Sequence, residues 1–152
     1  MKKAIFGLVV LILIFTASCN KTPAGGGSWT FLGLTYNATS CVGLNNYLAA
    51  TNSSNTNSTY FGGLTVFFPG STLPTTTGTY TVVDTIPTGN QVTISASVGG
   101  AADTTYTAIG GGQTVAVTVS NGKVSVSGSN IQLQNTSIKP GTYPVTFNIH
   151  TD

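Results

Sequence analysis

Few side chains in this sequence could carry acid–base chemistry, since it holds one histidine, three aspartates and no glutamate. Glycoside cleavage needs two carboxylates about 5 to 10 Å apart, which here would be Asp84 and Asp103. Asp84 precedes "TIPTGN" and Asp103 lies in "GGAADTT", and both are ordinary turn positions for aspartate. Nothing in the sequence indicates that these two carboxylates converge.

His150 is the one histidine that could act as a general base for a serine or threonine hydroxyl. It lies on the polar side of the last alternating segment, close to the chain end, where mobility works against catalytic geometry. The sequence has no Gly-x-Ser-x-Gly elbow. We therefore expect no enzyme, and a hydrolase that uses His150 with Asp84 or Asp103 is the second alternative.

The two cysteines do not indicate a metal site or a cofactor. Zinc needs a cluster of ligands at short spacings. If Cys19 carries lipid, as its place after the apolar N-terminal run predicts below, only Cys41 and His150 remain as ligands. The glycine run at 110–112 lacks the Lys-Ser/Thr of a phosphate loop and predicts a turn. For Cys41 we expect a buried thiol, with an intermolecular disulfide as the alternative.

The N-terminus has the layout of a secretory signal peptide, residues 1–18. A positive start is followed by the 12-residue apolar run Ala4–Phe15, which is too short to span a membrane, and then by small residues. Because Cys19 follows directly, the segment resembles a bacterial lipoprotein signal, although Thr16 stands where the lipobox has an aliphatic residue. The resemblance implies that Cys19 becomes the mature N-terminus and carries acyl chains such as palmitate. An ordinary secretory signal is the alternative.

Residues 19–28 form the expected tether between this anchor and a single domain at 29–152. Its composition, with Pro23 and the glycine run 25–27, is typical of flexible linkers. We expect an exported protein, anchored by lipid in the bacterial cell envelope at the outer membrane. The periplasmic face is favoured over the cell surface, since "NKTPAGGGS" lacks the acidic residues associated with surface export in Bacteroidetes lipoproteins.

The net charge of the chain after the predicted signal peptide argues against nucleic acid as a partner. From Cys19 onward there are three lysines and three aspartates, 3 − 3 = 0, and no arginine. Nucleic acid binding draws its affinity from Lys and Arg on phosphates, so we expect none. Contact with the membrane should occur through the lipid alone, and a carbohydrate or protein partner stays open.

Apolar and polar residues alternate with period two along the body of the chain, which predicts an all-β domain. In "VAVTVSNGKVSVSG" the Asn121-Gly122 pair favours a two-residue type I′ turn. That turn sets Val119 opposite Val124 and Val117 opposite Val126. Turn signals at short intervals favour an antiparallel β-sandwich of about 8–10 short strands. The alternative is a small closed β-barrel, like a lipocalin, that binds a small apolar ligand.

Three local features carry further structural predictions. A bulge at Leu32-Gly33 would place the side chains of Leu34 and Tyr36 on the same inward face of the strand as Trp29. Phe67, out of phase with its neighbours in "GLTVFF", suggests a strand covered on both sides. Pro144 should lie at a strand start or an edge.

Two surface features bear on modification and binding. Asp84-Thr85-Ile86 and Asp103-Thr104-Thr105 match a short O-glycan acceptor pattern of Bacteroidetes, which makes Thr85 and Thr104 candidate sites. Most aromatic residues fall at inward positions of the alternation. Tyr47 and Tyr60 flank the polar loop "TNSSNTNST" and are the least clearly buried, and exposed rings can stack on sugars.

Over its whole length the chain resembles small Bacteroidetes lipoproteins without an assigned activity. The matching segments are "SCNK", "GSWTFLGLTYNAT", "FPGSTLPTTTGTYTVVD" and the hairpin above. The resemblance implies an exported, lipid-anchored all-β domain and transfers no site. We therefore expect a cell-envelope protein that acts as a binding or structural β-sandwich module.

Overall fold

The computed structural model describes residues 26–52, 61–99, 104–135 and 141–151, and all the regular structure in these ranges is β-strand. The predicted signal peptide, Cys19, Tyr60 and Asp103 lie outside the described residues. The prediction of an all-β fold is confirmed, with eleven strands where about 8–10 were expected. The strands are β1 Gly27–Phe31, β2 Leu34–Asn37, β3 Ser40–Leu44, β4 Tyr47–Asn52, β5 Gly62–Phe67, β6 Gly78–Val82, β7 Gln91–Val98, β8 Thr104–Ala108, β9 Thr114–Ser120, β10 Lys123–Gln134 and β11 Thr142–His150.

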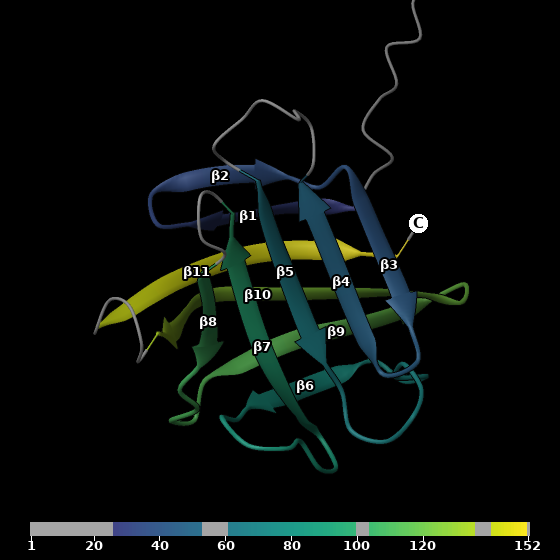
Figure 1. Ribbon diagram of the computed structural model, residues 1–152. Helices are drawn as coiled ribbons and strands as arrows, with labels where there is room; N and C mark the ends of the chain where they lie inside the picture. The colour runs from purple at the N-terminus through teal and green to yellow at the C-terminus, as the bar shows by residue number, and fades with distance from the viewer. Residues whose placement is uncertain (1–25, 53–60, 100–103, 136–140, 152) are drawn as a thin grey trace, which may run out of the picture.

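The eleven strands belong to one sheet that folds over into two layers (Figure 1). The first layer has the order β2-β1-β11-β10-β9-β6, and the second has β7-β5-β4-β3 with β8 beside β7. In Figure 1 the strands of the two layers cross at a steep angle. The order has two ends, β2 and β3. The arrangement as a whole is therefore sandwich-like, with open ends at β2 and β3. Because β8 pairs with both β7 and β10, the five strands β6, β7, β8, β10 and β9 form a closed circuit where the two layers join.

Two connections hold the layers together at their shared border. β6 and β7 pair in parallel, with Thr81 opposite Gln91. β8 pairs antiparallel with both β7 and β10. The parallel pair departs from the purely antiparallel sheet that was predicted. After Val82 the chain crosses from the first layer to the second, and β7 then runs in the same direction as β6.

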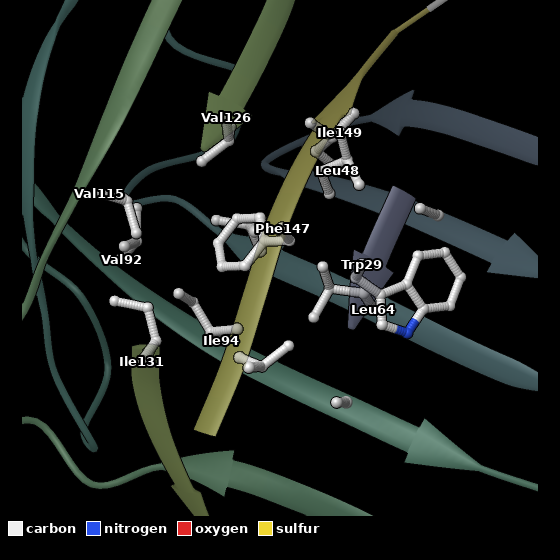
Figure 2. Close-up of a cluster of buried hydrophobic side chains, with 14 of the residues drawn as sticks. Trp29, Leu48, Leu64, Val92, Ile94, Val115, Val126, Ile131, Phe147 and Ile149 are labelled. Carbon is white, nitrogen blue, oxygen red and sulfur yellow. The ribbon is translucent and has the colours of Figure 1, made fainter. Parts of the chain in front are cut away.

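The core fills the space between the layers with one cluster of buried side chains. Phe147 and Ile149 of the first layer face Leu64 and Ile94 of the second in Figure 2. Every strand contributes alternate residues, which is why period two in the sequence predicted the buried positions. Trp29 stacks on Tyr36 across the β1–β2 pair, with ring centroids 5.2 Å apart.

The β9–β10 hairpin has the predicted register. Val119 lies opposite Val124 and Val117 opposite Val126. Asn121 and Gly122 form the turn with φ values of 52° and 76°, as a type I′ turn requires.

The prediction of a bulge at Leu32-Gly33 is wrong. Both residues have positive φ, 52° and 78°, and they form the two-residue turn of the β1–β2 hairpin. The phase change that the bulge was meant to explain is the reversal of the chain. Tyr36 is buried, but Leu34 is 40% exposed. A bulge does occur in β10, between Gly128 and Ile131.

The positions of Phe67 and Pro144 test two smaller predictions. Phe67 is 37% exposed, so β5 has one buried face, and the prediction of a strand covered on both sides is wrong. Pro144 pairs with Gln132 and lies beyond Val145, the last partner of β1 on β11. It is therefore near a strand start and at an edge on that side, as expected for a residue without a backbone donor.

Among the described residues the first strand begins at Gly27, two residues before the predicted domain start at Trp29. Gly27 pairs with Ile149 and has φ +90°, and a Cβ there would overlap the backbone of Asn148. The glycine is therefore required by the close approach of β1 to β11, although in the sequence it reads as part of a linker.

Candidate functional site

The residues of the hydrolase alternative lie on separate elements. His150 ends β11, where its backbone N–H donates to the Gly26 carbonyl at 3.1 Å and it pairs with Ser125. Asp84 lies exposed in a bend that follows β6. Among the described residues no hydrogen bond or ion pair joins them, and Asp103 lies outside this part of the chain. The described structure thus assembles no acid–base pair around His150.

Cys41 has the buried thiol that we expected, with 4% of the residue exposed. It lies on β3 against the backbone of Gly26. Within the described ranges no group of three potential metal ligands occurs. The same ranges contain no helix long and apolar enough to cross a membrane.

The two candidate glycan acceptors differ in their surroundings. Thr85 is exposed and follows β6, whereas Thr104 is half-buried at the first position of β8, opposite Val98. Glycosylation of Thr85 and Thr104 stays a prediction.

One hollow is a groove in the second layer, lined by residues at the end of β5, near the start of β7 and in the loops beside them. We call it the base groove; its volume is about 540 Å³. We call the lining residues of β5 and β7 its floor, and those of the β3–β4 turn and of the loop that connects β6 to β7 its walls. The residues that line it are Asn46, Phe67, Phe68, Pro69, Gly70, Asp84, Thr85, Ile86, Pro87 and Thr93.

Phe67 is the exposed aromatic residue of this floor, whereas Phe68 is buried. It pairs with Thr93 on one side and with Tyr47 on the other. The rings of Tyr47 and Phe67 are 5.8 Å apart and tilted by 50°. Because strand residues alternate between faces, Phe67 points outward while its neighbours Val66 and Phe68 are buried.

Hydrogen bonds within the protein fix both walls of the base groove. The Asn46 side-chain amide donates to the Phe68 carbonyl at 2.9 Å, and the Phe68 N–H donates to the Asn46 carbonyl at 2.7 Å. On the other side the Thr93 hydroxyl donates to the Thr85 carbonyl at 2.7 Å, and the Val83 N–H donates to β7. Because these bonds lie within the protein itself, they hold the walls in place and lower the ordering cost of binding.

Exposed apolar side chains continue from the groove across the second layer. Leu44, Tyr47 and Phe67 are direct cross-strand neighbours on β3, β4 and β5. Leu44 is 50% exposed, and Ile86 on the wall of the groove is 88% exposed. Solvent-exposed apolar groups gathered in this way mark binding surfaces more often than single ones do.

Charge in the described part of the chain is limited to Asp84 and Lys123. Asp84 lies in the base groove and has no hydrogen-bond or ion-pair partner among the described residues, whereas Lys123 lies at the β9–β10 turn. The groove therefore carries one negative charge and no described positive one.

A second hollow lies on the outer face of the first layer over the β10 bulge, with a volume of about 500 Å³. Hydroxyl residues such as Thr79, Ser127 and Thr146 line it. Its aromatic residue, Phe147, is only 4% exposed. Because it offers no exposed ring, the base groove is the stronger candidate.

The base groove lies at the far end of β3 from the start of the described chain. Gly26 packs against Ala38 and Cys41 near the beginning of β3. β3 then runs down the edge of the second layer to the turn that holds Asn46 (Figure 1). At about 3.3 Å per residue, the three steps along β3 from Cys41 to Leu44, the last strand residue before this turn, span about 10 Å.

Comparisons with models of known protein families, with curated proteins and with solved structures find no match to this chain. The candidate site therefore rests on geometry alone. Sequence reasoning missed Phe67 as a site residue because it took the out-of-phase ring as a sign of a second buried face. The signal that could have found it is the polar composition of the neighbouring strand positions, such as Thr65 and Thr93, which indicates that this face meets water.

Proposed function

We propose that this protein is a lipid-anchored protein of the bacterial cell envelope that binds a ligand or partner in the base groove and catalyses no reaction. One observation carries the proposal: a preformed groove with an exposed aromatic floor lies at the opposite end of β3 from Gly26. A chain tethered through residues before Gly26 would hold this end of the domain away from the membrane.

The anchor itself is proposed from the sequence. Cys19 follows the short apolar run and three small residues, and two or more acyl chains bind a membrane stably where one gives only marginal binding. The periplasmic face of the outer membrane is the proposed location. The low charge of the domain agrees with attachment through lipid alone, since electrostatic binding to anionic lipid needs clustered lysine or arginine.

Membrane fractionation of cells that express the full chain tests the anchor. The native protein should sediment with the outer membrane and partition into detergent, whereas Cys19→Ala should be processed poorly or released in soluble form. Cys41→Ala is the matched control and should fractionate like the native protein. Membrane retention of the Cys19→Ala variant, with unchanged mass, would contradict lipid anchoring.

Chemical-shift mapping by NMR tests whether the groove is where binding occurs. Isotope-labelled protein is mixed with a periplasmic extract fractionated by size, and its amide signals are followed. Binding should move signals from Phe67, Thr85 and Thr93, while signals around the hydroxyl-lined hollow at Ser127 stay in place. Changes confined to Ser127 and its neighbours would move the site to the first layer.

A further inference from the structure

We infer that the base groove takes a neutral saccharide, with the exposed face of Phe67 as the stacking platform. This inference rests on the proposed binding function and adds the chemical class of the ligand. A pyranose ring has an apolar face made of C–H bonds and a rim of hydroxyl groups. A site for it needs an accessible aromatic face beside hydrogen-bond acceptors and donors.

The aromatic part is present in the lining of the groove and beside it. Phe67 is 37% exposed at the end of β5, and the tilted ring of Tyr47 stands 5.8 Å from it on β4. The β-strand register fixes both positions, because Tyr47 lies directly opposite Phe67. Ile86, 88% exposed, adds an apolar edge on the opposite wall.

The polar part lies around the same floor. Asp84 offers a carboxylate that accepts hydrogen bonds and has no partner among the described residues, and Thr85 offers a hydroxyl on the same wall. Hydrogen bonds to a charged acceptor are stronger than those between neutral groups. The Thr93 and Asn46 side chains are already engaged in holding the walls, so Asp84 and Thr85 are the groups left to meet sugar hydroxyls.

The charge of the groove selects against acidic sugars. Its charged side chain is Asp84, and the described lysine, Lys123, is at the β9–β10 turn. A uronate or a phosphorylated sugar would meet repulsion with no cation to offset it. A purely apolar ligand would cover the Asp84 carboxylate and leave it without a partner, which is costly. A neutral sugar satisfies both parts of the site.

Isothermal titration calorimetry of the full chain in detergent micelles tests this inference, with cellohexaose and maltohexaose as neutral probes and trigalacturonate as the acidic probe. At least one neutral probe should bind, and trigalacturonate should bind at least about tenfold more weakly or not at all. Phe67→Ala should weaken binding of the neutral probe about tenfold, whereas Phe67→Tyr keeps the stacking face and should stay within about threefold.

Two controls keep the result interpretable. Leu34→Ala removes a side chain of similar exposure, 40%, on β2, and should leave binding unchanged. Asp84→Asn keeps the shape and removes the charge, so it should weaken neutral binding and reduce the discrimination against trigalacturonate. The inference would be overturned if trigalacturonate bound as tightly as the neutral probes or if no neutral probe bound. Full affinity for the neutral probe in Phe67→Ala would overturn it as well.

A second readout separates failure of the inference from failure of the proposed function. A photo-crosslinking amino acid placed at Ile86 is activated in cells that export the protein. If no neutral probe binds but position 86 crosslinks to one protein in a Phe67-dependent manner, the groove binds a protein, and only the saccharide inference falls. If neither sugar nor crosslink appears, the proposed binding function falls as well.

Discussion

Leu32 occupies a backbone conformation that leucine rarely adopts, with φ 52° at the first position of the β1–β2 turn. The left-handed region costs an L-residue about 1 to 2 kcal/mol, and asparagine tolerates it best among residues with a side chain. Leu32→Asn should therefore raise the free energy of unfolding by about 1 kcal/mol, measured by urea denaturation. The turn at Asn121 offers the reverse test, since Asn121→Leu should lower that free energy by a similar amount. A loss of stability in Leu32→Asn, or a gain in Asn121→Leu, would contradict the turn assignment.

Cys41 provides a second test at the scale of one residue. Cys41 is only 4% exposed, and its Cβ lies beside Gly26. Thiol reagents need an accessible thiolate. In a Cys19→Ala chain, Ellman's reagent should titrate less than about 0.1 thiol per native molecule and about one in denaturant. Rapid labelling of the native protein would show that Gly26 does not cover β3 in solution.

At the scale of the element, β1 depends on the close approach of Gly27 to β11. A Cβ at Gly27 would overlap the backbone of Asn148, and φ is +90°. Gly27→Ala should therefore lower the free energy of unfolding by at least about 2 kcal/mol, measured by chemical denaturation. Gly33 is the matched control, because it also has positive φ but has open space around its Cβ position. Gly33→Ala should cost only about 1 kcal/mol, and equal losses would show that the clash is relieved.

Elements were predictable where local signals agreed with the alternation of side chains. The β9–β10 hairpin is such a case, since Asn121-Gly122 sets both the turn and the register. The β1–β2 turn was missed because Leu32 is an unfavourable residue for the conformation it adopts. The parallel pairing of β6 with β7 could not be read from sequence, because it depends on how the sheet folds over and not on any adjacent residues.

The candidate site was less predictable than the fold. Tyr47 was recognised as incompletely buried, and Thr85 and Asp84 were singled out for other reasons. Their assembly around Phe67 depends on the crossing of the chain between layers, which brings the β6–β7 loop beside the β3–β4 turn. The spacing of these residues in the sequence does not indicate that the β6–β7 loop lies beside the β3–β4 turn.

For the whole molecule, the scarcity of charge makes a prediction about stability. The described residues contain two charged side chains, Asp84 and Lys123, and no ion pair between them. Dissolved salt therefore has few charge–charge interactions to screen among these residues. The thermal midpoint should change by less than about 2 °C between roughly 0.05 and 0.5 M NaCl. Sodium sulfate, which strengthens apolar burial, should raise it, and a large fall in NaCl would reveal ionic interactions in the remaining residues.

The pairing of β1 with β11 also sets the order in which this chain can fold. Trp29 lies opposite Phe147, so the first and last described strands meet only after more than a hundred intervening residues have emerged. Contacts of such long sequence separation slow folding to milliseconds or seconds. A chain emerging N-terminus first would therefore stay incomplete until β11 is free to pair. If the proposed export occurs, that delay would keep the chain unfolded while it crosses the membrane, and the structure would form on the far side.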